Sequence, residues 1–475
     1  MKRIFYILLP VLFLAACTKD ISRFNEETKR PAKVPAGPLF SSAVKQVADA
    51  LADPSVNTNV LRFTVKHWAM AVYQDEAQYD FTTRAIPQVW WTRMYRDALI
   101  DLKDAAKIVS EDIALSAGVK DNQLAIIDIM QVYTYHILVN TFGDVPYIEA
   151  LDPTKLFPKY DDAQTIYKDL LKKLGEDITK LNASSGGFSA TEDLVYKGDI
   201  AKWIKFAHSL QLKMGMIFAD VDPATAKAAV EAADAKAFTS SADNAKFTYL
   251  VPSPNFNPIH KEVIVSGRSD YVAAKDLMDQ LIALSDPRKS LFFGTNNAGV
   301  YQGGTVGTVN TFSNMSKPST KVSAPDAPLV FLDYSEIEFY RAEAKERGFN
   351  VAGTAVMHYN NAITASILDW GGSAADATTY LARPDVAYAT ATGGYKQKIG
   401  FQKWIGLYNR PFDGWLEMRR LDYPVLPLPV GAISGFPNRL PYPGNEQQLN
   451  GTNYTAAAAK YGGDKVESKL FWDKF

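Results

Sequence analysis

A single cysteine limits how this chain can stabilise its fold. Cys17 is the only cysteine among 475 residues, so no disulfide can form within the chain and a hydrophobic core has to supply the stability. Cys17 follows the positive pair Lys2 and Arg3 and an apolar run over 4–16, which is too short to span a bilayer. This pattern predicts an export signal over 1–16 and a lipid on the Cys17 thiol. The alternative is an ordinary secretory signal followed by a chance cysteine.

The overall composition is that of a globular protein. Hydrophobic residues make up 47% of the chain and charged residues 22%, and no apolar stretch after residue 17 approaches the length of a membrane span. The 51 basic and 52 acidic residues give a net charge of −1, which argues against a nucleic-acid-binding protein. The aromatic content of 12% supplies rings for a core, and a surplus would suit flat stacking surfaces.

Helical periodicity dominates the chain after a polar, proline-containing segment. Residues 17–38 are predicted to form a lipidated cysteine and tether, and residues 39–475 a single body. Within the body, residues 238–330 form a loop-rich insertion and residues 371–475 a turn-rich final part. Apolar spacing predicts helices over 39–51, 59–74, 87–110, 121–140, 161–181, 199–218, 223–235, 271–283, 334–347, 352–368 and 412–420.

Six of these helices form consecutive pairs. The pairs are 121–140 with 161–181, 199–218 with 223–235, and 334–347 with 352–368. Their spacing is close to the period of tetratricopeptide-like arrays, although the repeat consensus is degenerate. The sequence therefore predicts a mainly α fold built of tetratricopeptide-like helix hairpins, with an irregular, loop-rich ligand face.

The sequence predicts no catalytic residue, cofactor or metal. It contains no zinc spacing, phosphate-binding loop or nucleophile elbow, and no EF-hand-like spacing supports a bound calcium ion. Glu336, Glu338 and Glu343 lie on one predicted helix. We expect them to pair inside the fold with a basic residue such as Arg419 or Arg420. A carboxylate pair for glycoside hydrolysis is the alternative.

Several segments together resemble the SusD/RagB family of nutrient-binding lipoproteins, which partner TonB-dependent outer-membrane transporters. Within that family they resemble the SusD-like branch described as starch-binding and associating with the outer membrane. The segments are 140–147 (NTFGDVPY), 203–212 (WIKFAHSLQL), 334–344 (YSEIEFYRAEA), 402–405 (QKWI), 414–420 (GWLEMRR), 439–443 (RLPYP) and 471–473 (FWD). The resemblance extends over essentially the whole chain.

Most of these segments also have a structural role. Gly143 is expected to end a helix. Trp203, Phe206, Leu210 and Met214 form an apolar stripe at helical spacing, which is typical of a core. The segments that carry the resemblance therefore say little about the ligand.

The resemblance implies a lipid-anchored protein of the outer membrane, exposed at the cell surface. It implies that a helical body docks on a SusC-like TonB-dependent transporter, and that a more irregular face captures an oligosaccharide and passes it on without catalysis. Three alternatives remain open: a peptide ligand, a helical-repeat adaptor with no soluble ligand, and a lipid-anchored glycoside hydrolase.

Two aromatic-rich regions are the predicted ligand site. Aromatic rings can stack on sugar faces while amide side chains bond to hydroxyl groups. The predicted residues are Trp68, Tyr73, Gln74, Tyr79, Trp90 and Trp91 in the first region, and Phe293, Asn296, Asn297, Tyr301 and Phe312 in the second. The alternative for each residue is that its side chain packs the loop onto the body. Adjacent helical residues point about 100° apart, so only one of the two neighbouring tryptophans is expected in the core.

Overall fold

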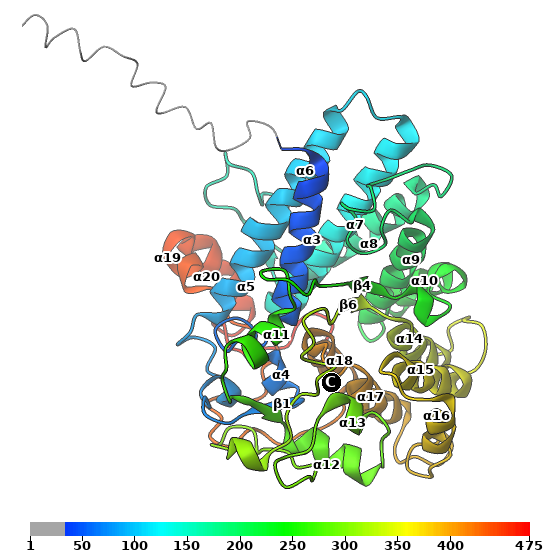
Figure 1. Ribbon diagram of the computed structural model, residues 1–475. Helices are drawn as coiled ribbons and strands as arrows, with labels where there is room; N and C mark the ends of the chain where they lie inside the picture. Colours follow the sequence, from blue (N-terminus) through cyan, green and yellow to red (C-terminus); the bar gives the residue numbers. More distant parts are fainter. Residues whose placement is uncertain (1–33) are drawn as a thin grey trace, which may run out of the picture. The chain divides into compact units, whose positions relative to one another are not determined.

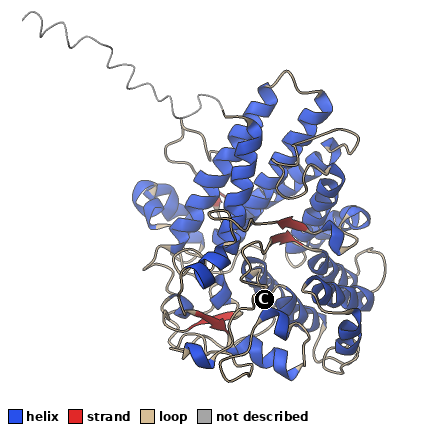
Figure 2. Cartoon of the chain, in the orientation of Figure 1, coloured by secondary structure: helices blue, strands red, loops and turns tan. Residues whose placement is uncertain are grey.

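The computed structural model describes residues 34–475, and helices dominate this part of the chain (Figures 1 and 2). The predicted signal segment and Cys17 lie outside the described residues. The first described helix, α3 (Ala36–Ala52), already includes Pro38, which we assigned to the tether. A proline is tolerated in the first helical turn because its missing N–H would have no helical partner there. Within residues 34–475, no helix is both long and apolar enough to cross a membrane.

Three helix hairpins confirm the predicted pairs. They consist of α7 (Ala117–Phe142) with α8 (Ala163–Lys180), α9 (Ile200–Ile217) with α10 (Pro223–Ala233), and α14 (Tyr334–Glu346) with α15 (Ala355–Asp369). Asp162, Asp199 and Asp333 cap the N-termini of α8, α9 and α14, since each side chain accepts a backbone N–H from the first turn. Successive hairpins touch, because α8 contacts α9 and α9 contacts α14 (Figure 1).

The remaining helices enclose these hairpins. A continuous helical stretch consists of α5 (Ile86–Thr92), a π-helical segment (Arg93–Leu99) and α6 (Ile100–Glu111), and it packs on α3. Shorter helices are α4 (Leu61–Thr64), α11 (Pro258–His260), α12 (Lys275–Ala283), α13 (Lys289–Phe292), α16 (Ala374–Leu381), α17 (Tyr395–Gly406), α18 (Pro411–Leu421), α19 (Gly444–Leu449) and α20 (Gly451–Lys460). Among helices α16 to α20, only α18 was predicted from the sequence.

The described strands form three two-stranded antiparallel pairs (Figure 2). The pairs are β1 (Trp68–Met70) with β5 (Tyr271–Ala273), β2 (Val145–Pro146) with β3 (Tyr160–Asp161), and β4 (Ala245–Phe247) with β6 (Leu329–Leu332). The helix predicted over 59–74 is therefore wrong beyond α4. All three residues of β1 are buried and pair with a strand some 200 residues away, and such tertiary contacts override local helical spacing.

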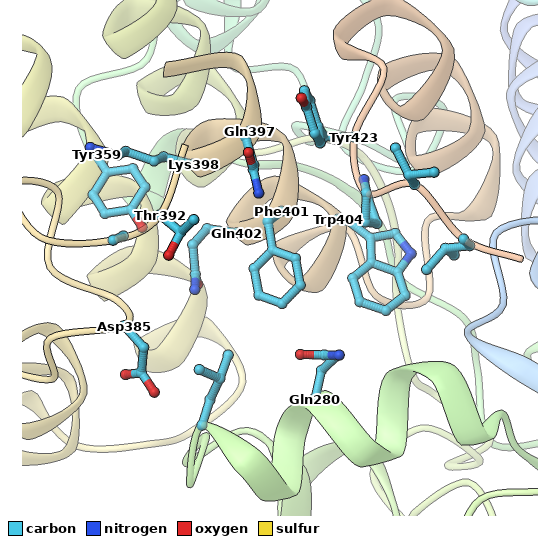
Figure 3. A pocket seen from close by; sticks show the side chains of 15 residues that line it. Gln280, Tyr359, Asp385, Thr392, Gln397, Lys398, Phe401, Gln402, Trp404 and Tyr423 are labelled. Carbon is cyan, nitrogen blue, oxygen red and sulfur yellow. The ribbon is translucent and has the colours of Figure 1, made fainter. Parts of the chain in front are cut away.

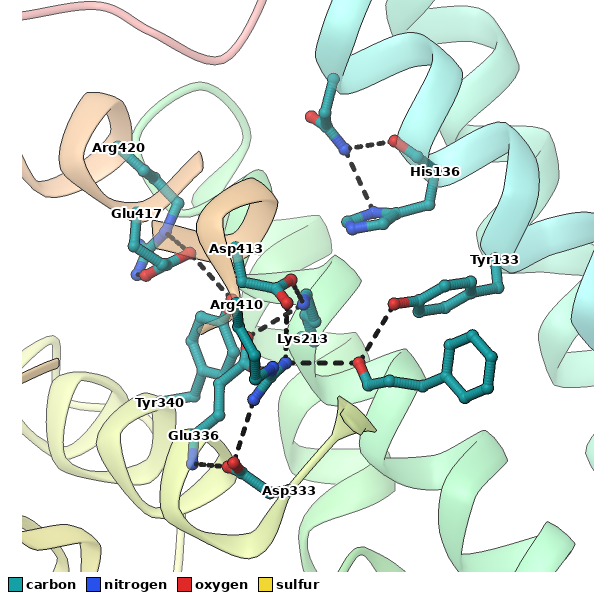
Figure 4. Close-up of polar contacts among 12 residues, drawn as sticks. Tyr133, His136, Lys213, Asp333, Glu336, Tyr340, Arg410, Asp413, Glu417 and Arg420 are labelled. Atoms are coloured by element: carbon teal, nitrogen blue, oxygen red, sulfur yellow. Dashed lines mark hydrogen bonds and ion pairs between the residues drawn. The ribbon is translucent and has the colours of Figure 1, made fainter. Parts of the chain in front are cut away.

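A buried cluster of charges connects α9, α14 and α18 (Figure 4). The Nζ atom of Lys213 lies 2.9 Å from Oε1 of Glu336 and also pairs with Asp413. Arg410 donates to Glu336 at 2.5 Å and to Asp413 at 2.8 Å. Burial alone would lower the pKa of Lys213, but the carboxylates of Asp413 and Glu336 raise it. The lysine is therefore held charged in the core.

A second buried cluster joins α14, α17 and α18. Glu343 accepts a hydrogen bond from Nη1 of Arg420 at 2.7 Å. Glu417 accepts from Arg420 and from Lys403, each at 2.7 Å. The expected pairing of Glu343 with Arg420 is thereby confirmed.

Arg419, the other basic residue considered as a partner, does not pair with these carboxylates. Its guanidinium donates to the backbone oxygens of Asn140 at 3.0 Å and Asn438 at 2.6 Å, so it binds the chain near the end of α7 and makes no contact with the α14 carboxylates. Glu338 pairs instead with Arg341 at 2.7 Å and with His358 at 2.8 Å. These buried carboxylates are enclosed by basic groups and act as structural links.

Candidate functional site

The two aromatic-rich regions lie against each other in the structure. Beside the β1–β5 pair, Asn310 links them directly: its Nδ2 donates to the oxygen of Met70 at 2.8 Å, and its backbone N–H donates to the oxygen of Ala71 at 3.0 Å. The amide of Gln78 donates to the oxygen of Gly307 at 2.8 Å. We call the surface formed by residues 71–78 and 294–318 the loop face.

Tyr73 is the most exposed aromatic residue of the first region. It is 37% exposed, and the guanidinium carbons of Arg84 and Arg268 lie 5.5 and 5.1 Å from the centre of its ring. These distances allow cation–π attraction and place two hydrogen-bond donors beside the ring. The neighbouring Gln74 is half-buried, and its amide donates to the backbone oxygen of Val72.

The second region presents two half-buried rings in the same way. The Nζ atom of Lys289 lies 4.9 Å from the centre of the Tyr301 ring. That of Lys317 lies 4.8 Å from the centre of the Phe312 ring, and it also donates to Oδ1 of the exposed Asn297 at 2.8 Å. The accessible rings of the loop face therefore each have a cationic donor beside them.

Five predicted site residues are buried, so the prediction that they contact the ligand is wrong. Trp68, Tyr79, Trp90, Trp91 and Phe293 have exposed fractions of 0, 3, 2, 7 and 0%. The indole N–H of Trp68 donates to the hydroxyl of Tyr408 at 3.0 Å, and the Phe293 ring lies 5.1 Å from the Tyr408 ring. These side chains fix the loop face to the helical body and are not available for stacking on a ligand.

Both adjacent tryptophans are in the core, although only one was expected there. Trp90 lies against Phe412 of α18, with ring centres 6.2 Å apart. Trp91 lies against Phe142 of α7 at 5.2 Å and against Tyr95 at 4.9 Å. Helix α5 is covered on two sides, so residues that point in different directions are both buried.

Asn296 forms a turn and is only 7% exposed. Its Oδ1 accepts the backbone N–H groups of Ala298 at 2.9 Å and Val300 at 3.1 Å, and its Nδ2 donates to the oxygen of Asn314 at 2.8 Å. Its side-chain groups are thus used within the loop. Of the predicted residues, Tyr73, Gln74, Asn297, Tyr301 and Phe312 remain accessible in full or in part.

Sequence reasoning missed the four cations beside the rings of the loop face, Arg84, Arg268, Lys289 and Lys317. Arg84 and Arg268 reach Tyr73 from segments 11 and 195 positions further along the chain, so no local pattern marks them. Lys317 follows Phe312 within the same loop and is the one cation that local sequence could have suggested.

The arrangement is suited to binding a polar ligand. Two carboxylates beside the cations of Tyr73 are engaged, since Glu76 pairs with Arg84 and Asp270 pairs with Arg268 at 2.5 Å. Aromatic surface flanked by fixed donors matches the chemistry of a polyhydroxylated ligand. Within residues 34–475, no group of three His, Cys, Asp or Glu side chains is placed to hold a metal ion.

Solved structures with the same fold cover nearly the whole chain. A chitin-binding protein is 28% identical, with 93% of this chain and 100% of that chain covered and a TM-score of 0.80. A SusD homolog from Bacteroides uniformis is 25% identical, with 92% and 99% covered and a TM-score of 0.76. A chitin-binding SusD homolog from Flavobacterium johnsoniae is 22% identical, with 92% and 98% covered and a TM-score of 0.78. No curated protein matches the chain.

The family comparison covers the helical body from its first helix to beyond α18. The SusD-like family described as "Starch-binding associating with outer membrane" matches residues 28–443. Proteins of this family are glycan-binding proteins associated with the outer membrane, and they are not enzymes. The sequence resemblance and the mainly helical fold are thus confirmed, and the chain belongs to the SusD-like family of outer-membrane-associated glycan-binding proteins.

Proposed function

We propose that this protein is a lipid-anchored surface protein that captures an oligosaccharide on its loop face and passes it to a SusC-like TonB-dependent transporter. The family gives the class of ligand and the association with the outer membrane. The lipid on Cys17, the surface exposure and the transporter partner rest on the sequence pattern and on the family resemblance.

One observation of the structure carries the proposal. The two regions predicted from aromatic content lie against each other, and their accessible rings Tyr73, Tyr301 and Phe312 each lie beside a cationic side chain. Ring faces favour the apolar faces of sugars, and guanidinium, ammonium and amide groups donate hydrogen bonds to hydroxyl oxygens. Because the similar protein at 28% identity is a chitin-binding protein, chitin-derived oligosaccharides are the first ligands to test.

Calorimetric titration of residues 18–475 with a panel of oligosaccharides and peptides tests the proposal. We expect one glycan class to bind and to be recovered uncleaved. Tyr73→Ala should weaken that binding by about tenfold, which corresponds to the loss of roughly one stacking contact. The matched control is Tyr454→Ala, since Tyr454 is a half-buried tyrosine of α20, outside the loop face.

Other outcomes would contradict parts of the proposal. Binding of peptides alone would replace the ligand class, and release of reducing sugar would contradict a purely binding role. Equal affinity in wild type and Tyr73→Ala would remove the loop face as the site while leaving glycan capture in place. The transporter partner is tested by co-purification from membranes, where absence of any barrel protein would contradict it.

A further inference from the structure

Figure 3 shows a cavity of about 430 Å³, and no residue of the loop face lines it. Its walls come from α12, from α17, from the segment before α17 and from residues 423–426. The volume is within the range of about 300–1,000 Å³ that is typical of small-ligand pockets. None of the accessible predicted site residues lines this cavity.

An aromatic floor is the first feature of the cavity that suits a ligand. Phe401 is half-buried, so part of its ring is accessible. Beside it lies Trp404, whose ring centre is 6.0 Å from that of Phe401 and whose indole N–H donates to the oxygen of Val65 at 2.8 Å. Trp404 is 1% exposed and therefore supports the floor. The half-buried ring of Tyr423 adds a second aromatic surface at the rim.

Free neutral hydrogen-bonding groups surround this floor. In the view of Figure 3, Gln397 and Gln280 approach the Phe401 ring from above and below. Within residues 34–475, neither these two amides nor the hydroxyl of Tyr423 hydrogen-bonds to another group of the protein, whereas the neighbouring Gln402 amide is paired with the hydroxyl of Tyr380. Each amide has donor and acceptor capacity to offer a ligand.

The charged groups at the mouth are already engaged. Lys398 donates to the backbone oxygen of Tyr388 at 2.7 Å. Asp385 accepts from the guanidinium of Arg383 at 2.8 and 3.0 Å. A ligand that enters the cavity therefore meets neutral donors and acceptors around a ring, and the cavity favours a neutral molecule over an ion.

We infer that this cavity is a second carbohydrate site, which binds a neutral mono- or disaccharide unit with one sugar face on Phe401 and hydroxyl groups on Gln280, Gln397 and Tyr423. The inference rests on the proposed function for its ligand class. The cavity and the loop face differ in location, because the loop face is built from residues 71–78 and 294–318, none of which lines the cavity. Residues 423–430 link the two places, since the N–H of Val430 donates to the oxygen of Val306 at 3.1 Å.

Short sugars allow the two sites to be tested separately. Neutral mono- and disaccharides are titrated into residues 18–475, and hydrogen–deuterium exchange locates the protected segments. We expect protection of residues 395–406 and 422–430, and an affinity about tenfold lower in Phe401→Ala. Gln280→Trp is a second variant, which places a bulky ring at the mouth from an exposed position on α12. Gln447→Ala, at an exposed glutamine of α19, is the matched control.

The outcomes distinguish this inference from the proposed function. If sugars bind, and Phe401→Ala and Gln280→Trp both match wild type while Tyr73→Ala does not, the second site is overturned and the loop face stands. If both cavity variants lose binding and protection of residues 395–406 while Gln447→Ala does not, the inference is supported. If no carbohydrate of any length binds the wild-type protein, both proposals are overturned.

Discussion

Glu343 is a single side chain on which several helices depend. It is fully buried and accepts hydrogen bonds from Arg420 at 2.7 Å and from Arg347 at 2.8 Å. Glu343→Ala would leave two arginines near each other without this carboxylate, so we expect a loss of about 3–5 kcal/mol in the free energy of unfolding. Unfolding in denaturant measures this loss of stability. Glu346→Ala, an exposed position on the same helix, is the control and should change stability by less than about 0.5 kcal/mol.

The same variant has a defined dependence on pH. Burial alone would raise the pKa of Glu343, but Arg420 and Arg347 hold it below its ordinary value of 4.5. A carboxylate with a lowered pKa in the folded state stabilises the fold above its unfolded pKa and loses this contribution as the pH falls. The stability difference between wild type and Glu343→Ala should therefore shrink below pH 4.5. An equal difference throughout the acid range would contradict the ion-pair explanation.

Residue identity predicts chemistry better than it predicts exposure. The sequence showed that residues 68–95 are rich in aromatic rings, and the structure leaves Tyr73 at the surface while it buries Trp68, Trp90 and Trp91. All are equally apolar in the local pattern. Which ring faces outward depends on distant partners such as Phe412 of α18, and those contacts have no local signature.

The end of α7 is set by Gly143. Its φ of 87° lies in the region that favours glycine, and a Cβ atom there would lie 2.3 Å from Oη of Tyr461. We expect the backbone strain in Gly143→Val to lower the free energy of unfolding by about 1–3 kcal/mol, and the clash with Tyr461 to lower it further. Oligosaccharide preference should stay unchanged. Unfolding curves and titrations measure the two effects. Gly175→Val in α8, where a side chain meets open space, should be nearly neutral. A change of ligand preference in Gly143→Val without loss of stability would assign this turn to the binding site.

Element prediction succeeded where apolar residues recur at helical spacing. The three hairpins have such patterns, and their boundaries agree with the structure to within a few residues, even though α7 and α14 are buried on nearly all sides. Helix α17 was missed because its buried residues include Gln402 and Lys403, so its sequence lacks a clean apolar stripe. The predicted helix over 59–74 failed because β1 is completed by β5, which lies far away in the sequence.

Attachment to the membrane is a property of the whole molecule. In residues 34–475 no helix is suited to span a bilayer, and the proposed anchor is the lipid on Cys17. Cys17→Ser should therefore move the protein from the membrane fraction to the soluble fraction, because the serine hydroxyl cannot take the thioether-linked lipid. Fractionation followed by immunoblotting measures this. Unchanged retention in the membrane fraction would refute the anchor, and Ser41→Ala in α3 serves as the control.

The buried charges of α9, α14 and α18 also constrain the order in which this protein can fold. Lys213 and Asp413 are 200 positions apart in the chain, and Glu336 lies between them. A nascent chain that ends before residue 410 contains the lysine and the glutamate, which pair with each other, but lacks Arg410 and Asp413, which complete the cluster. The early hairpins can therefore form helices, but their final packing has to wait for a helix made near the end of synthesis.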